Sequence, residues 1–237
     1  MSVQTEAQIF LGSQRGITQS EGTRNMHTLN FGSYQAEGRE AFGRVLVFND
    51  VALSAGKAEN INTTKPTEIV LLPIVGGLEL VDRYGESVFV NSGESFRFLT
   101  FPESNFKVHN PYPLETINYL EIHLTPDLSD NYMDNHMDDS PLHLFSLSDK
   151  NRLIPSFSGL GEKVTGYVGK YTGREEDEFL VINPENGIFT FIIQGAFEVQ
   201  NRLLEKGDAL SLLNVATLEF EALSNDAIIL VVEVGMD

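Results

Sequence analysis

The stretch Gly195–Asp208, GAFEVQNRLLEKGD, decides the fold. It begins with a glycine, runs through a short strand and a turn, and ends in the pair Gly207-Asp208, which opens another strand. The first half of the chain carries a weak copy over Gly77–Glu94, GLELVDRYGESVFVNSGE. An apolar strand precedes each copy. Two copies of one strand-turn-strand unit predict two similar β domains in tandem.

The rest of the chain also alternates short strands with turns. The segments are rich in Val, Ile, Phe and Thr, which suit a pleated, half-buried surface. Several alternate apolar and polar residues, as in Thr217–Ala222, where Leu218, Phe220 and Ala222 share one face. Strands are expected at 44–49, 68–75, 78–82, 87–91, 96–101, 116–124, 164–171, 179–182, 189–194, 197–200, 209–213, 217–223 and 227–234.

This pattern is typical of the cupin jelly roll, in which a Gly-acidic pair opens a strand after a hairpin. The predicted fold class is therefore all-β, a bicupin with two tandem jelly-roll barrels packed around a shared apolar interface. The first barrel is expected at residues 1–125 and the second at residues 145–237. Residues 126–144 are polar and acidic and are expected to form a connector.

Composition narrows the range of partners. The formal net charge of -18 repels phosphate backbones and anionic lipid surfaces, so neither direct nucleic-acid binding nor membrane association is expected. No apolar run approaches the ~18 residues of a membrane helix. The absence of cysteine excludes disulfides and thiolate metal sites and fits a cytoplasmic protein. The expected partner is a small molecule or another protein.

Three stretches in the first half resemble the pirin family of bicupins. His27–Tyr34, HTLNFGSY, is similar to the pirin signature His-Thr-Phe-Ser-Phe-Gly-x-Tyr, and Phe42–Gly56 is similar to the stretch that follows it in pirins. Glu68-Ile69-Val70, running into a glycine turn, resembles the family's Glu-x-Val strand. The resemblance implies a bicupin with an iron site in the first barrel. Some pirins cleave quercetin with dioxygen, and others act in transcriptional regulation through partner proteins.

The resemblance also implies where the iron ligands would lie. Pirins supply two histidines six and four residues before the Glu-x-Val glutamate, and those positions hold Asn62 and Thr64. A later His-x-Glu supplies the other two ligands, and the matching positions hold Phe106 and Val108, with His109 next to them. None of the four matching residues is a good iron ligand, and a single histidine does not hold iron. No cofactor is therefore expected.

Two ways in which the protein could be an enzyme remain open. Glu68 or His109 is a candidate base for a cofactor-free isomerase or lyase. A metal site built from unaligned residues requires three side chains to converge on one point, from among His27, Glu68, His109, Glu115 and His123. His123 shares a face of the strand at 116–124 with Tyr119 and Glu121, and this is interpreted as a polar strand face.

Two further regions carry residues of metal-ligand type. The connector contains Asp127, Asp130, Asp134, His136, Asp138, Asp139 and His143, without the glycine and closing glutamate of an EF-hand, and is interpreted as a solvated linker. No histidine follows His143, so a histidine-ligated metal in the second barrel is not expected.

Together these observations predict a metal-free pirin relative that binds a small molecule or a protein, and they leave open whether it is also an enzyme. The candidate pocket is lined by Asn62, Thr64, Glu68, Phe106, Val108 and His109. The alternative is a metal-dependent oxygenase similar to quercetin 2,3-dioxygenase.

Overall fold

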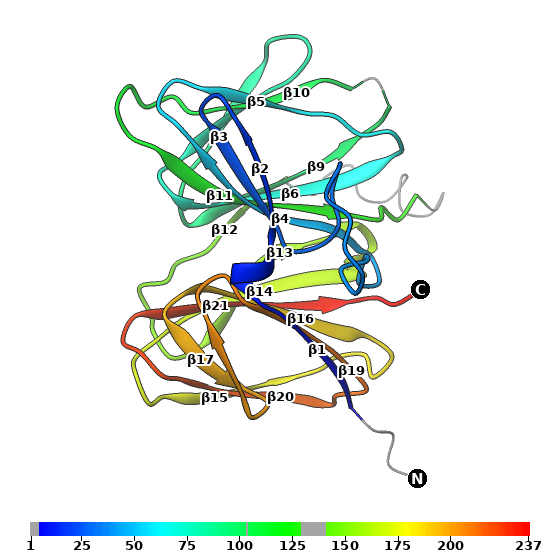
Figure 1. Ribbon diagram of the computed structural model, residues 1–237, viewed down its shortest axis with the longest axis vertical. Coiled ribbons are helices and arrows are strands. Elements are labelled where there is room, and N and C mark those ends of the chain that lie inside the picture. The colour runs from blue at the N-terminus through cyan, green and yellow to red at the C-terminus, as the bar shows by residue number, and fades with distance from the viewer. Residues whose placement is uncertain (1–4, 103, 129–140) are drawn as a thin grey trace.

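A computed structural model describes residues 5–102, 104–128 and 141–237. Within these residues the chain forms two β-barrels, one above the other in Figure 1, and each barrel consists of a large and a small antiparallel sheet. The all-β bicupin expected from the sequence is confirmed. No helix in the described part of the chain is long and apolar enough to cross a membrane.

The first barrel closes a seven-stranded sheet on a four-stranded one. In spatial order the large sheet contains β12 (Leu142–Leu144), β9 (Glu94–Thr100), β6 (Thr67–Val75), β11 (Ile117–Leu124), β4 (Val45–Leu53), β3 (Thr23–His27) and β2 (Gly16–Ser20). The small sheet contains β5 (Ala58–Ile61), β10 (Phe106–His109), β7 (Leu78–Val81) and β8 (Ser87–Val90).

The second barrel follows the same plan with a six-stranded and a four-stranded sheet. Its large sheet contains β1 (Glu6–Phe10), β19 (Ala209–Leu213), β16 (Gly187–Gln194), β21 (Ala227–Val234), β14 (Val164–Tyr171) and β13 (Leu153–Ser158). Its small sheet contains β15 (Glu176–Leu180), β20 (Thr217–Ala222), β17 (Ala196–Val199) and β18 (Arg202–Glu205). Two short 3-10 helices, η1 (Gly12–Gln14) and η2 (Leu160–Glu162), lie in connections.

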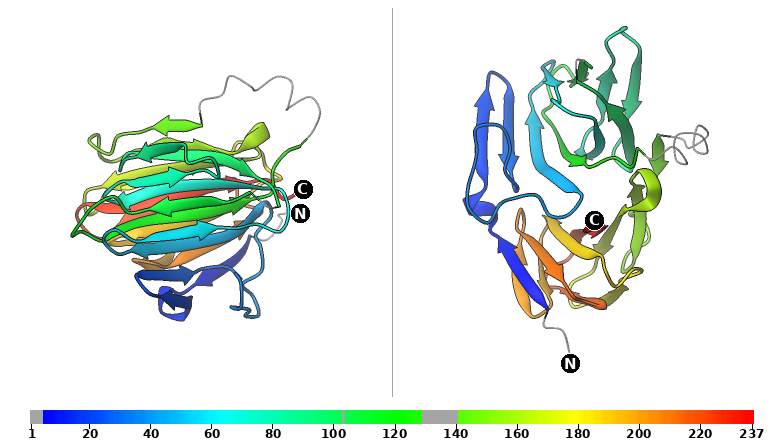
Figure 2. Two further views of the ribbon diagram at one scale, coloured as in Figure 1. Left: turned by 90° about the horizontal axis from the view of Figure 1, so that it is seen from above. Right: turned by 90° about the vertical axis from the view of Figure 1, so that its right-hand side faces the viewer.

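The two barrels exchange strands, which corrects the expected boundaries. β1 was assigned to the first barrel but pairs with β19 of the second, with Glu6 opposite Leu213. β12, in the expected connector, pairs with β9 of the first barrel. Figure 2 shows the N-terminal segment running along one side of both barrels. In each large sheet, a segment from beyond the barrel's own sequence thus covers the backbone groups of a strand that would otherwise lie at the edge: β1 covers β19, and β12 covers β9.

Three apolar cores hold the structure together. One fills each barrel, and the third lies between the two large sheets. In the third core Phe48 of β4 contacts Phe189 and Phe191 of β16, with ring centroids 5.2 Å and 4.9 Å apart. This confirms the shared apolar interface. The central strands of both large sheets are therefore buried on both faces, one toward a barrel interior and one toward the other barrel.

Candidate functional site

The interior of the first barrel is apolar along part of β11 and polar along the rest. Ile117 and Tyr119 point into the apolar core of this barrel, and Glu121 and His123 continue the same face of the strand. The opposite face, with Leu120, packs against the second barrel.

The polar face expected for His123 is present, but it is turned into the barrel and not toward solvent. Glu121 is 6% exposed and His123 is 5% exposed. Alternation of polar and apolar residues indicates a solvent-exposed face only when one face of the sheet is in contact with water. One face of β11 lines the interior of the first barrel, and the other packs against the second barrel.

Polar side chains from three neighbouring strands complete this part of the interior. Asn25 and His27 of β3 and Asn49 of β4 are buried, and Glu59 of β5 faces them. The Asn25 Nδ2 group donates a hydrogen bond of 2.6 Å to Glu59 Oε1. The Nε2 atom of His123 lies 2.6 Å from Glu121 Oε1. A buried carboxylate, Glu121, and a half-buried one, Glu59, thus lie at one end of the barrel.

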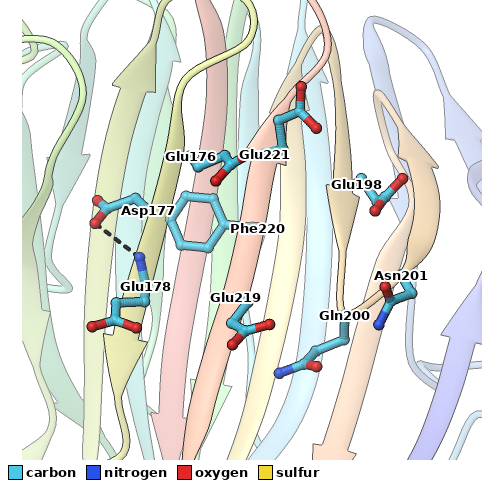
Figure 3. A pocket seen from close by; sticks show the side chains of 9 residues that line it. All are labelled: Glu176, Asp177, Glu178, Glu198, Gln200, Asn201, Glu219, Phe220 and Glu221. Carbon is cyan, nitrogen blue, oxygen red and sulfur yellow. Dashed lines mark hydrogen bonds between the residues drawn. The ribbon is translucent and has the colours of Figure 1, made fainter.

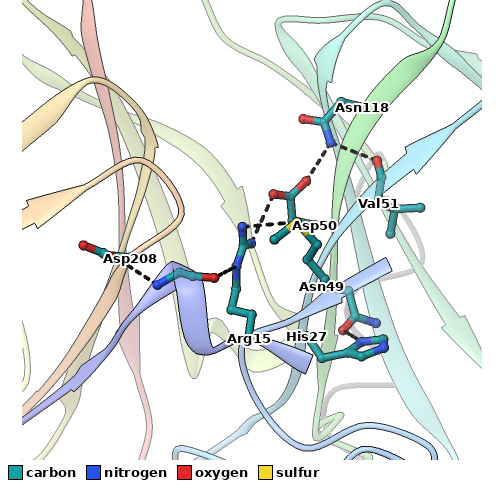
Figure 4. Close-up of polar contacts among 9 residues, drawn as sticks. Arg15, His27, Asn49, Asp50, Val51, Asn118 and Asp208 are labelled. Atoms are coloured by element: carbon teal, nitrogen blue, oxygen red, sulfur yellow. Dashed lines mark hydrogen bonds and ion pairs between the residues drawn. The ribbon is translucent and has the colours of Figure 1, made fainter. Parts of the chain in front are cut away.

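Both ring nitrogens of His27 have a hydrogen-bond partner. Nδ1 lies 2.7 Å from Asn49 Oδ1, and Nε2 lies 2.8 Å from the Thr18 hydroxyl. Figure 4 shows the His27–Asn49 contact beside the Arg15–Asp50 pair. With the Asn49 oxygen as acceptor, Nδ1 carries the proton and Nε2 accepts from Thr18. His27 therefore has no lone pair free for a metal ion.

A pocket of about 230 Å³ opens among these side chains. It is lined by Asn25, Phe31, Glu59, Asn60, Ile61, Asn62, Glu121 and His123, and we call it the interior pocket. Three polar atoms in this part of the barrel are buried without a well-formed hydrogen bond in the described residues: Asn25 Oδ1, and the Glu59 Oε2 and Tyr119 hydroxyl oxygens, which lie near each other. Buried polar atoms rarely stay unpaired, because each costs about 1–3 kcal/mol, so these atoms indicate a place for water or a ligand.

Burial perturbs the acid groups of the interior pocket. The pKa of Glu59 is raised to about 7, first because burial penalises the charged carboxylate and second because the Glu121 carboxylate is close. The pKa of the Tyr119 hydroxyl is raised well above its usual value by burial, Glu121 and Glu59. Perturbed acids that gather in a pocket favour a functional site over a purely structural one.

The residues expected at the iron-ligand positions are only partly brought together. Phe106 and Val108 face the barrel interior, opposite Ile61 and Glu59 of β5. Asn62 lies just beyond β5, where it is exposed and forms part of the rim of the interior pocket, and Thr64 is exposed in the loop that follows. The inward positions on β5 are thus Glu59 and Ile61. Counting back from Glu68 led instead to Asn62 and Thr64, which lie beyond the end of β5.

The side chains at these inward positions do not provide the ligand atoms that the iron site implied by the resemblance would need. Glu59 is the one oxygen donor among them, since Ile61, Phe106 and Val108 offer no donor atom. In the described residues no three His, Asp or Glu side chains are placed to hold a metal ion. Asp130, Asp134, His136, Asp138 and Asp139 of the connector lie outside the described residues.

Glu68 does not belong to the interior pocket, contrary to expectation. It points away from the barrel interior toward the interface, where it is 1% exposed. Its Oε1 accepts a 2.8 Å hydrogen bond from the Leu160 amide of η2 and lies 3.8 Å from Arg97 Nε. Burial raises its pKa to about 7, and the Leu160 hydrogen bond and Arg97 oppose this rise. Glu68 links the two barrels.

His109 lies on the outer face of the small sheet, so it is also outside the interior pocket. Its Nδ1 atom is 3.0 Å from Glu79 Oε2, and this hydrogen bond lowers the pKa of Glu79. Glu115 is exposed in the loop before β11. The five residues proposed for an unaligned metal site therefore lie in four different environments and do not converge. A cofactor-free enzyme would need its catalytic base in the pocket, and neither Glu68 nor His109 lines the interior pocket.

A larger cavity of about 590 Å³ lies on the outer face of the small sheet of the second barrel. Glu176, Glu221 and Glu198 stand side by side on β15, β20 and β17 (Figure 3). We call these three residues the carboxylate row. Its side chains are open to solvent, and Arg174 pairs with Glu221 at 3.1 Å. It is an acidic surface groove and contains no buried unpaired atom.

The comparisons agree with this architecture. Residues 164–234 match the family model of the quercetinase C-terminal cupin domain. No curated protein matches the chain. The structure of YhhW from Escherichia coli superposes with a TM-score of 0.78 at 15% identity, over 97% of this chain and 97% of that one.

Two further solved structures show the same fold. Bacterial pirin YhhW in complex with nickel(II), from Escherichia coli, has a TM-score of 0.76 at 16% identity, over 97% of this chain and 99% of that one. Quercetin 2,3-dioxygenase from Acinetobacter baumannii has a TM-score of 0.69 at 12% identity, over 97% of this chain and 79% of that one. The chain therefore has the bicupin fold of the bacterial pirins along nearly its whole length, and residues 164–234 of its second barrel match the quercetinase C-terminal cupin family.

Proposed function

We propose that this protein binds a small molecule in the interior pocket of its first barrel, without a resident metal ion. The observation that carries the proposal is the group of three buried polar atoms without a well-formed hydrogen bond in the described residues, Asn25 Oδ1, Glu59 Oε2 and the Tyr119 hydroxyl. A barrel that served only as a scaffold would gain stability by filling this space with apolar side chains. The cytoplasmic location expected from the cysteine-free composition is part of the same proposal.

The donor set supports binding without metal. Iron and nickel sites need several converging nitrogen or oxygen ligands, and the inward positions of β5 and β10 offer only the Glu59 carboxylate. Both nitrogens of His27 already have partners, and His123 is bonded to Glu121. Recruiting these histidines would require breaking buried hydrogen bonds.

Metal content tests the metal-free part of the proposal. The untagged protein is purified from cells supplied with iron, manganese and nickel, and its metals are quantified by elemental mass spectrometry. We expect only traces. One metal ion per chain, retained by wild type and lost in Glu59→Gln and His123→Gln variants, would overturn this part of the proposal.

Ligand screening tests the binding part. A library of small polar compounds is screened by thermal shift, and hits are mapped by amide chemical shifts. We expect hits to perturb Asn25, Glu59 and Glu121, and to be weakened by Glu59→Gln. A library that moved only residues outside the interior pocket would overturn the proposal, and binding of a protein partner to the outer surface would then replace it.

The second candidate is a metal-dependent oxygenase similar to quercetin 2,3-dioxygenase. The fold shared with that enzyme and with the nickel complex of bacterial pirin favours it. Quercetin consumption with dioxygen uptake, dependent on an added metal ion, would support it. If wild type and the Glu59→Gln variant both left quercetin unchanged in the presence of iron, nickel or manganese, the oxygenase would lose its support.

A further inference from the structure

The unpaired atoms of the interior pocket are mostly hydrogen-bond acceptors. Asn25 has given its amide N–H to Glu59, so the atom it leaves unpaired is the carbonyl oxygen Oδ1. Glu59 has one oxygen bonded to Asn25, and Oε2 is left without a well-formed hydrogen bond in the described residues. The Tyr119 hydroxyl can donate or accept. A ligand that pairs Asn25 and an ionised Glu59 must therefore present N–H or O–H donors.

The charges around the pocket favour a positive ligand. Glu59, Glu121 and His123 are the titratable side chains that line it, and no lysine or arginine is among its described lining residues. Glu121 is bonded to His123 at 2.6 Å, whereas the polar partners of Glu59 are neutral, Asn25 and the Tyr119 hydroxyl. Glu59 is thus a half-buried carboxylate without a cation, an arrangement that costs free energy unless a positive group approaches. Burial and the nearby Glu121 carboxylate raise its pKa.

Asn25 supplies an observation that is independent of the acid groups. Its side chain is neutral and the residue is only 6% exposed, yet Oδ1 has no partner among the described residues although Asn25 lines the pocket. An ammonium group placed between Oδ1 and Glu59 Oε2 satisfies both atoms, because it carries more than one N–H donor.

The remaining wall and the volume limit the rest of the ligand. Phe31 lines the pocket and is held between two histidines, with ring centroids 5.1 Å from His27 and 5.9 Å from His123. An aromatic face attracts a cation within ~6 Å of its centroid. A pocket of about 230 Å³ corresponds to roughly eight water molecules at ~30 Å³ each, which suits a compact amine.

We propose that the ligand of the interior pocket is a small organic cation with an ammonium group, which donates hydrogen bonds to Glu59 Oε2 and Asn25 Oδ1 while its carbon chain lies beside Phe31. This inference rests on the proposed function, since it names the ligand class of the same pocket. The acidic partners select against carboxylates and phosphates.

Four probes of similar size test the ligand class: butylamine, tetramethylammonium, 1-butanol and butyrate. Each is titrated into the full-length protein, and dissociation constants are taken from amide chemical shifts of Asn25, Glu59 and Glu121. Butylamine is expected to bind tightest. Tetramethylammonium has the charge but no N–H donor, and we expect it to bind about tenfold more weakly. 1-Butanol is expected to bind more weakly still, and butyrate not at all.

Two matched variants separate the pocket from the general negative charge of the protein. Glu59→Gln removes the unpaired carboxylate, and we expect butylamine to bind at least tenfold more weakly. Glu198→Gln changes the net charge by the same amount in the carboxylate row of the other barrel, and we expect no change in butylamine affinity. Equal loss in both variants would show attraction by net charge alone and would overturn the inference.

The outcomes distinguish this inference from the proposed function. If 1-butanol or butyrate perturbs the pocket amides and butylamine does not, the pocket binds small molecules, but the inferred preference for an organic cation is wrong. If no probe perturbs these amides up to 50 times the protein concentration, the inference fails, and the library screen described above decides the proposed function by itself. Tight butylamine binding that survives Glu59→Gln also contradicts the inference.

Discussion

The guanidinium of Arg15 lies 3.1 Å from the carboxylate of Asp50, and the Arg15 side chain is only 6% exposed. Arg15 follows η1, where the chain passes from the second barrel to the first, and Asp50 belongs to β4 of the first barrel. On the other side of η1, the Gly12 amide donates a 2.6 Å hydrogen bond to Asp208 of the second barrel (Figure 4). The crossing segment is thus held to both barrels by charged side chains.

Removal of Arg15 is expected to destabilise the protein. Arg15→Ala leaves the Asp50 carboxylate with Asn118 as its remaining side-chain partner, and we expect a loss of about 2 kcal/mol in the free energy of unfolding. Urea denaturation measures it. Lys57→Ala breaks the exposed pair with Glu21 and is the control, with an unchanged midpoint. Equal midpoints for both variants would contradict a structural role for Arg15.

Stability is expected to fall as pH rises from about 4.5 to about 7. Glu68 has a pKa of about 7 in the folded protein and 4.5 as its ordinary value, so the folded state keeps a proton that the unfolded state has released. This group therefore favours folding most below pH 4.5, and the contribution is lost above pH 7. At about 1.4 kcal/mol per pKa unit the loss is about 3 kcal/mol.

The variant Glu68→Gln keeps a neutral side chain at the interface at every pH. We expect its free energy of unfolding to change less between pH 5 and pH 7.5 than that of wild type, as measured by urea denaturation at each pH. Glu115→Gln, at an exposed site, keeps the wild-type slope. A Glu68→Gln slope that equals the wild-type slope would show that Glu68 titrates normally.

The carboxylate row is expected to destabilise the second barrel. Glu176 lies opposite Glu221, which lies opposite Glu198, so three like charges cross adjacent strands. Glu198→Lys replaces repulsion by attraction, and we expect a gain of about 0.5 kcal/mol that shrinks in 0.5 M salt. Thermal unfolding at low and high salt measures it. A gain that did not depend on salt would point to strand propensity instead.

The Tyr119 hydroxyl is expected to have opposite effects on stability and on binding. It is buried without a well-formed hydrogen bond in the described residues, so Tyr119→Phe removes an unsatisfied group and leaves the ligand-free protein equally stable or more stable by up to about 1 kcal/mol. If a ligand occupies the interior pocket, the same change weakens its binding. Calorimetry on the two proteins separates the effects. Destabilisation of the ligand-free protein would mean that a bound water pairs the hydroxyl.

The repeated hairpins at Gly77–Glu94 and Gly195–Asp208 were enough to predict the two barrels. Both are local in sequence, and they form β7–β8 and β17–β18. Apolar strands such as Val164–Tyr171 and Ala227–Val234 were found with their observed limits. The strands that were missed, β1, β5 and β10 among them, are short and partly polar. Their pairing partners stabilise them more than their own composition does.

The interior pocket was not predicted, for two physical reasons. Glu121 and His123 alternate with apolar residues as an exposed strand face does, and sequence alone does not show that both faces of β11 are covered. Glu59 stands in Ala58–Ile61, which has no strong strand signal, and its partner Asn25 is 34 residues away. The sequence signal for this part of the pocket was Glu59 itself, a carboxylate in a strand that pairs with β10.

The exchange of β1 has a consequence for how the protein is made. β1 is translated before the strands of the first barrel, yet it completes a sheet whose other members are translated after them, with Glu6 paired to Leu213. The second barrel therefore cannot finish its sheet until the N-terminus returns to it, and the returning segment must stay unpaired during most of synthesis. Cleavage at the connector would not yield two independent domains, because the first fragment would carry away an edge strand of the second.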